Sequence, residues 1–134
     1  MKKQEIDKLS YKIIGAAIEV HRTLGPGLLE SMYHKCLKKE LQLQGINFNS
    51  ELEVEVNYKG EIIKTDLRCD LLVEDSIVVE LKAVDKIHPI CEAQLLTYMK
   101  LLKKPKGVLI NFNCDNIFRS GQKTFVNSFY RDLE

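Results

Sequence analysis

The sequence predicts an α/β fold in which a central mixed β-sheet is flanked by helices, with the elements in the order α-α-β-β-β-α-β. Three observations support this prediction. Apolar residues first recur at helical spacing, they then alternate with charged residues as in a half-buried strand, and a further helical segment connects two apolar strands as a crossover. The chain has 134 residues, 45% of them hydrophobic, which fits a single domain covering residues 1–134.

Two helices are expected at the N-terminus. The first is indicated by one apolar stripe whose members follow each other at spacings of three or four, namely Ile6, Leu9, Ile13, Ala17, Val20 and Leu24. The segment Gly25-Pro26-Gly27 ends this helix. A second helix is expected from Leu28 to about Gln44, with Gly45 as its C-terminal cap.

Three strands are expected after the helices. Residues 51–58 alternate strictly between polar and apolar side chains, which indicates a strand with one face in water. Lys59-Gly60 makes a turn, and the next two strands are expected at Ile62–Val73 and Ile77–Val84.

The C-terminal part is expected to complete the sheet. Pro89 suits the first turn of a third helix that runs to about Lys103. The short apolar strand Val108–Phe112 follows and should be covered on both faces. After Cys114 we expect a loop, a short strand around Lys123–Val126 and a frayed end.

Charged residues interrupt two of the expected strands. Asp70 lies on the second strand, and Glu80 and Lys82 lie on the third, where alternation places them on one face roughly 7 Å apart. Two carboxylates beside an ammonium can hold a hard divalent cation, Mg²⁺ or Mn²⁺, and position an attacking water, with the backbone carbonyl of Leu81 as a further ligand. The alternative is that Asp70 forms an ion pair with Arg68 or Lys82 at a sheet edge.

The loop between these strands decides whether the two acids can meet. If Glu74-Asp75-Ser76 is a loop of three residues, Val73 pairs with Ile77 and Asp70 lies opposite Glu80 on the same face. A loop of two residues would place the acids on opposite faces. One shared site therefore requires an odd loop or a bulge.

Three further residues are candidates for the same site. Glu30 lies in the first turn of the second helix, where it could reach a metal directly or through water, or could simply interact with the helix dipole. Gln94 and Tyr98 share one face of the third helix, and the alternative for them is a surface that faces the sheet margin. The histidines fit no ligand spacing, and His88 is expected to be a loop or cap residue.

Net charge, apolar runs and cysteine spacing limit the kinds of protein that this sequence can encode. The net charge of +1 gives no global attraction to nucleic acid, so a nucleic-acid contact must come from a local patch. No apolar run approaches the length of a membrane span. The four cysteines form no C-x-x-C pair, and we expect reduced, buried or half-buried thiols in a cytoplasmic protein.

Four short motifs in order resemble the GxxExxY family, which is assigned to the PD-(D/E)XK nuclease-like superfamily. They are Gly27-Leu-Leu-Glu30-Ser-Met-Tyr33, Arg68-Cys-Asp70, Glu80-Leu-Lys82 and Gln94-Leu-Leu-Thr-Tyr98. The resemblance implies a restriction-endonuclease-like core over nearly the whole chain. It implies that Glu30 is the helical acid, Asp70 the metal-binding aspartate and Glu80 with Lys82 the E-x-K pair, with Gln94 and Tyr98 as an additional helix motif.

The chain departs from its relatives at two positions. Cys69 stands where the superfamily has proline before the aspartate, and Cys91 stands where relatives have histidine. The second departure puts activity or substrate preference in doubt if that histidine contacts substrate.

Two functions remain open from the sequence. The first is a metal-dependent nuclease that hydrolyses phosphodiester bonds, with DNA favoured over RNA, in which Asp70 and Glu80 hold Mg²⁺ or Mn²⁺ and Lys82 positions the nucleophile. The second is a non-catalytic or partner-dependent nucleic-acid-binding module on a nuclease fold. A homodimer or a subunit of a larger complex is open in both cases.

Overall fold

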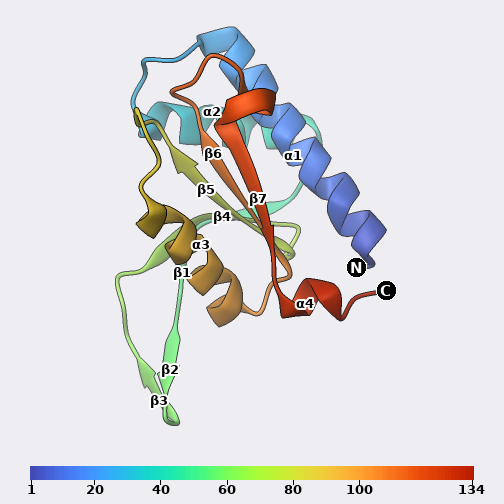
Figure 1. The fold of residues 1–134 in the computed structure, drawn as a ribbon, viewed down its shortest axis with the longest axis vertical. Helices are drawn as coiled ribbons and strands as arrows, with labels where there is room; N and C mark the ends of the chain where they lie inside the picture. Colours follow the sequence, from blue (N-terminus) through green and yellow to red (C-terminus); the bar gives the residue numbers. More distant parts are fainter.

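The computed structural model describes residues 1–134 and confirms the α/β fold. A five-stranded mixed sheet in the order β1-β4-β5-β6-β7 has α1 and α2 on one face and α3 on the other (Figure 1). Only β5 and β6 pair in parallel. The elements are α1 (Lys3–Leu24), α2 (Glu30–Leu43), β1 (Phe48–Glu53), β2 (Val56–Tyr58), β3 (Glu61–Ile63), β4 (Arg68–Val73), β5 (Ile77–Lys82), α3 (Pro89–Leu102), β6 (Lys106–Asn111), a π-helical turn η1 (Ile117–Gly121), β7 (Gln122–Val126) and α4 (Ser128–Arg131).

The two N-terminal helices form as expected from their apolar stripes. The residues of the first stripe are buried in the larger core cluster, except Leu24, which is partly buried against it. The α2 helix ends where Ile46 N donates to Leu41 O at 2.9 Å around Gly45, whose φ of 71° only glycine adopts without strain. Gly45 therefore ends the helix as predicted, one residue after the C-cap Gln44.

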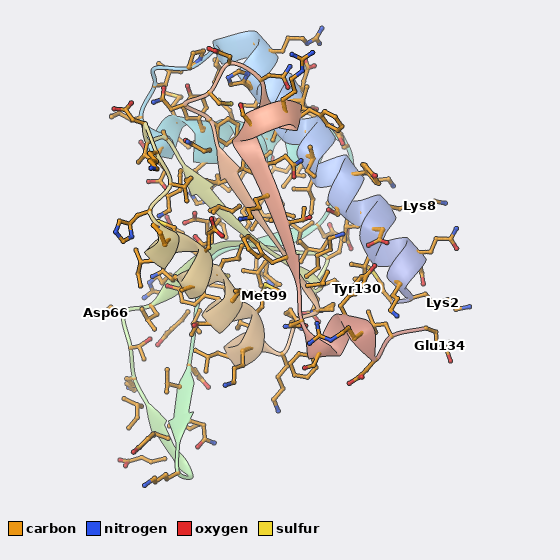
Figure 2. All side chains as sticks on the ribbon, viewed as in Figure 1. Lys2, Lys8, Asp66, Met99, Tyr130 and Glu134 are labelled. Atoms are coloured by element: carbon orange, nitrogen blue, oxygen red, sulfur yellow. The ribbon has the colours of Figure 1, made fainter.

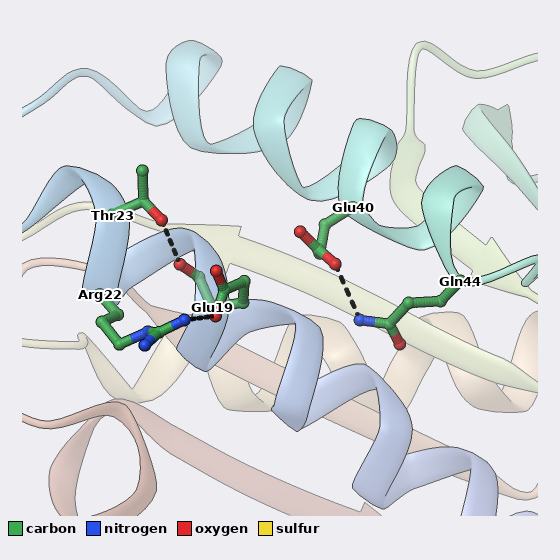
Figure 3. Close-up of polar contacts among 5 residues, drawn as sticks. All are labelled: Glu19, Arg22, Thr23, Glu40 and Gln44. Carbon is green, nitrogen blue, oxygen red and sulfur yellow. Dashed lines mark hydrogen bonds and ion pairs between the residues drawn. The ribbon is translucent and has the colours of Figure 1, made fainter.

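Polar contacts on the outer sides of these helices are local. Arg22 pairs with Glu19 on α1, and Gln44 donates to Glu40 at the end of α2 (Figure 3). Exposed pairs one helical turn apart contribute a few tenths of a kcal/mol each. The helices are thus held on the sheet mainly by apolar burial. None of the helices has the length and apolar character needed to cross a membrane.

The expectation of single strands at 51–58 and 62–73 is wrong. Both are broken, and β2 and β3 form a separate hairpin that projects from the body next to the segment containing Asp66 (Figures 1 and 2). The break lies at the buried Val54, whose N–H donates to Leu67 O and whose carbonyl accepts from Thr65 Oγ1, both at 2.9 Å. A side chain thus replaces a ladder bond, which alternation in the sequence cannot indicate.

The C-terminal part contains more structure than expected. The strand expected around Lys123–Val126 is confirmed as β7, and it is the fifth strand of the sheet. The expected loop contains η1, and the expected frayed end contains α4. The α3 helix begins at Pro89 with His88 as its N-cap, and Met99 lies between α3 and the sheet (Figure 2).

Candidate functional site

The strand register brings Asp70 and Glu80 close together at the ends of two neighbouring strands. Val73 pairs with Ile77, as the three-residue loop predicted, and the pairing continues to Leu71 and Val79. The loop adopts a left-handed turn, with φ of 49° at Glu74 and 52° at Asp75. Val78, two residues before Glu80, packs in the cluster under α3, so Glu80 faces α3. The charges of both Glu80 and Asp70 act on Tyr98 of α3, so both carboxylates lie near that helix.

A break in the sheet frees the Asp70 side chain. β1 pairs with β4 at Ser50–Leu71 and at Leu52–Cys69, but Glu51, opposite Asp70, is unpaired and has a φ of 53°. The chain changes face there, because Leu71 packs with α1 and α2 whereas Cys69 packs under α3. A left-handed conformation at a residue other than glycine is unfavourable by about 1–2 kcal/mol. The fold keeps this unfavourable conformation of Glu51 at the position where Asp70 leaves the hydrogen-bond ladder between β1 and β4.

Asp70 is held against β5 by one hydrogen bond. Its Oδ2 accepts from Leu81 N at 2.8 Å, which places the carboxylate between the positions of Glu80 and Lys82. The N–H and C=O of a strand residue point the same way, so the Leu81 carbonyl also faces the β4 side. The alternative in which Asp70 forms an ion pair with Arg68 or Lys82 is wrong, because neither residue pairs with it.

Glu80 is a buried acid without a complete set of partners. It is 5% exposed, and its Oε1 has no hydrogen-bond partner. Burial first, and then the negative charge of Asp70, raise the pKa of Glu80 to about 9, against an ordinary value of 4.5. Native proteins rarely leave a buried polar atom unpaired. The Glu80 carboxylate therefore needs a proton or a cation.

The donor set fits a hard divalent cation. Asp70 and Glu80 present carboxylate oxygens to each other, and the Leu81 carbonyl faces the same side of β5. Oxygen donors of this kind are preferred by Mg²⁺ and Mn²⁺. No three His, Cys, Asp or Glu side chains converge into a complete metal-binding group, so the remaining ligands would be a carbonyl, water or substrate oxygens.

Glu30 approaches these groups from α2. Partial burial raises the pKa of Glu30. Of the nearby groups, Lys82 and His34 lower this pKa and Asp70 raises it. Glu30 is also the first residue of α2, so its carboxylate interacts favourably with the positive end of the helix dipole, which was the alternative role expected for it. The structure thus brings Glu30, Asp70, Glu80 and Lys82 into one electrostatic neighbourhood.

Tyr33 explains how the loop before Glu30 is held. Its ring is stacked on Phe112 of the core at a centroid distance of 4.5 Å, and the side chain is fully buried. Its hydroxyl donates to Gly25 O at 2.5 Å and accepts from Leu28 N at 3.2 Å. The tyrosine therefore anchors the glycine-rich loop and the start of α2 to the end of β6.

The two α3 candidates lie differently. Tyr98 is buried beside Cys69, and its pKa is raised by burial and then by the charges of Glu80, Cys69 and Asp70. Burial and the same two acids raise the pKa of the Cys69 thiol to about 12. Gln94, one turn before Tyr98, is exposed. Tyr98 thus lies near the acids, whereas Gln94 is exposed to solvent.

Near the candidates lie one residue that the sequence analysis set aside, His34, and one that it missed, Asn111. His34 follows Glu30 by one helical turn, and its Nε2 is 3.3 Å from Ser50 Oγ on β1. The spacing of four on a helix could have found it. Asn111 is buried and pairs with Lys82 across β5 and β6. No signal along the sequence indicates that pairing.

Fold and site together define a nuclease-like α/β protein with two acids and a lysine at one end of its sheet. A family model described as PD-(D/E)XK nuclease superfamily matches residues 7–124, and the chain therefore belongs to the PD-(D/E)XK nuclease superfamily.

Among solved structures, the chain is similar to one titled "Crystal structure of SSO0001", with a TM-score of 0.54 and 25% identity. That match covers 76% of this chain and 55% of the other, so this chain spans little more than half the length of that protein. No curated protein matches the sequence.

Proposed function

We propose that this protein is a metal-dependent nuclease of the GxxExxY type that hydrolyses phosphodiester bonds, in DNA rather than RNA. Superfamily membership supports the reaction class. The observation that carries the proposal is the buried Glu80, whose Oε1 has no hydrogen-bond partner and whose carboxyl group interacts with Asp70. Such a pair of acids is stable when a cation or a proton compensates its charge.

Each side chain has a distinct role in this proposal. Asp70, Glu80 and the Leu81 carbonyl would hold Mg²⁺ or Mn²⁺, and Glu30 would contribute through a water. The ion supplies charge neutralisation at the scissile phosphate and a more acidic bound water. Lys82 would orient the attacking water or stabilise charge on the phosphate, because an ammonium is a compact donor. Tyr98 would support the acids from α3, and the exposed Gln94 would contact substrate.

Three basic residues of the C-terminal third form ion pairs with acids of the same chain. Lys104 pairs with Asp75, Lys106 with Asp7 and Lys123 with Glu92, at 2.9 Å, 3.0 Å and 3.0 Å. These pairs reduce the charge available to a nucleic acid. We therefore expect substrate contacts close to the candidate site and modest affinity for duplex DNA without a partner.

A cleavage assay tests the proposal. Single-stranded, duplex, nicked and branched DNA and RNA are incubated with the protein in Mg²⁺ or Mn²⁺, beside Asp70→Ala and Lys82→Ala. Asp66→Ala is the matched control, because Asp66 is an exposed acid in the segment before β4. Loss of cleavage in the first two variants with retention in the control supports the nuclease. Retention in all three variants means a contaminant or another site.

A non-catalytic nucleic-acid-binding module, acting alone or within a larger complex, is the second candidate. The observation in its favour is that no three acid or histidine side chains converge into a complete metal group. Metal binding separates the two. Mn²⁺ at 100 times its Kd should stabilise a metal-binding fold by about 2.7 kcal/mol, or roughly 10 °C in Tm. No shift in the wild-type protein at saturating Mn²⁺ would favour the module.

A further inference from the structure

A buried amide lies at the end of β6, beside the candidate site. Asn111 is 9% exposed and is one of three buried polar residues in the protein, with Ser10 and Glu80. It is the last residue of β6, and its Cα partner across the parallel pairing is Lys82, the last residue of β5. Neither the superfamily match nor the motifs of the sequence assign it a role.

The amide of Asn111 binds the backbone of one residue in the chain that leaves β5. Its Nδ2 donates to Val84 O at 2.9 Å, and its Oδ1 accepts from Val84 N at 3.1 Å. The Oδ1 also accepts from Asn113 N at 3.2 Å. The side chain thus acts as one more strand residue and prolongs the pairing after the ladder has ended.

Two neighbouring bonds extend the same attachment. Phe112 N donates to Lys82 O at 2.9 Å, and Asn113 Nδ2 donates to Asp85 Oδ1 at 3.0 Å. Ala83 packs against the larger core cluster, but Val84 and Asp85 are exposed, so apolar burial does not hold these two residues in place. The hydrogen bonds from Asn111 and Asn113 attach them to the end of β6, next to the bond from Phe112 N to Lys82 O.

We infer that Asn111 is a positioning residue for Lys82: by clamping Val84 it fixes the end of β5 and hence the direction in which the Lys82 side chain leaves the strand. The inference rests on the proposed function for the role of Lys82, but the clamp itself does not. A lysine has four side-chain torsions, so a defined position of its ammonium begins with a defined Cα–Cβ direction. An error of about 1 Å in the position of a catalytic group can lower a rate about 100-fold.

Only an amide makes both contacts with one backbone residue, and this suggests the variants. Asn111→Leu is similar in size and makes no hydrogen bond. Asn111→Asp keeps the acceptor for Val84 N and Asn113 N but loses the donor to Val84 O. Val108→Ala is the matched control, because it destabilises the same strand through a core cavity and does not touch the end of β5.

Amide hydrogen exchange on the full-length protein tests the clamp without any activity. In Asn111→Leu we expect Val84 and Phe112 amides to exchange about 10-fold or more faster than in Val108→Ala, since both bonds at the end of β5 loosen. In Asn111→Asp the exchange rates of these amides should lie between those of the wild type and Asn111→Leu. This variant replaces Asn111→Leu in the test if the leucine variant does not fold. Unchanged protection of the Phe112 amide, which bonds to Lys82, would overturn the inference.

Kinetics then test the consequence for Lys82. On any substrate that the wild-type protein cleaves, Asn111→Leu should lower kcat by about 10- to 100-fold with little change in KM, and Asn111→Asp should restore part of it. Val108→Ala should retain kcat below its Tm. If the Val84 and Phe112 amides exchange faster in Asn111→Leu but its kcat equals that of the wild type, the positioning role is refuted. A wild-type protein that does not cleave removes the proposed function, and the exchange result alone then decides the inference about the clamp.

Discussion

Replacing Glu80 by glutamine should stabilise the metal-free protein at neutral pH. The pKa of Glu80 is raised to about 9 in the folded protein, above an ordinary value of 4.5. The folded state therefore keeps a proton that the unfolded state releases, and stability contributed by Glu80 is present below pH 4.5 and is lost as the pH rises toward 9. Glu80→Gln has no proton to lose.

The magnitude follows from the difference between the two pKa values. Each pH unit above the unfolded pKa reduces wild-type stability by about 1.4 kcal/mol, so at pH 7 the protein loses about 3 kcal/mol that the glutamine variant retains. For a chain of this size that corresponds to roughly 10 °C in Tm. The amide needs partners of its own, so the observed gain in stability should be at or below this value.

Urea denaturation of both proteins in EDTA, at pH 5 and pH 7.5, measures the effect. The free energy of unfolding of the variant should exceed that of the wild type by a margin that grows between the two pH values. Mn²⁺ should then stabilise the wild type and leave the variant nearly unchanged. Glu53→Gln, at an exposed end of β1, is the control and should show no such difference. Parallel pH profiles for wild type and Glu80→Gln would refute the reasoning.

Three further substitutions test the packing around the site. Tyr33→Phe removes the hydroxyl bonds to Gly25 O and Leu28 N and should destabilise the protein by about 1–2 kcal/mol in urea and weaken stabilisation by Mn²⁺; an unchanged response to Mn²⁺ would show that the loop does not place Glu30. Glu51→Gly should raise the stability by up to about 1 kcal/mol by thermal denaturation, because glycine tolerates the φ of 53°, and a loss would mean that the side chain is needed there. Gly107→Ala should cost about 1–3 kcal/mol, because its Cβ would lie 2.6 Å from Met99 Sδ; a neutral result in urea would show that α3 can move away from β6.

Much of the candidate site could be predicted from local rules. The loop of three residues between the second and third expected strands predicted that Val73 pairs with Ile77, and the register confirms this pairing as far as Leu71 and Val79, one residue before Asp70 and Glu80. The reason is that side chains alternate along a strand, so the length of a short loop decides which residues face each other. Helical spacing in the same way predicted the buried stripe of α1.

The breaks in the strands could not be predicted in this way. Residues 51–58 alternate throughout, yet the chain leaves the sheet at Val54 because Thr65 Oγ1 replaces a ladder bond. The reversal of face at Glu51 depends on a backbone torsion that no residue type in the sequence signals. Both features arise from contacts between segments that meet only after the chain has folded.

By itself, the sequence determined the α/β class, the positions of the helices and the set of acids and lysine that could form a site. The fold class and the helices follow from local periodicity, and the acids and the lysine follow from residue chemistry, so both can be found without knowing the fold. Only the tertiary structure decided that β7 joins the sheet, that Asp70 reaches across to Leu81 and that Glu80 is buried without a full set of partners. The Asn111 clamp belongs with these, because it joins residues that are 27 positions apart in the chain. The physical reason is that burial and hydrogen-bond pairing depend on which segments become neighbours, and a periodic pattern in one segment carries no record of its partner.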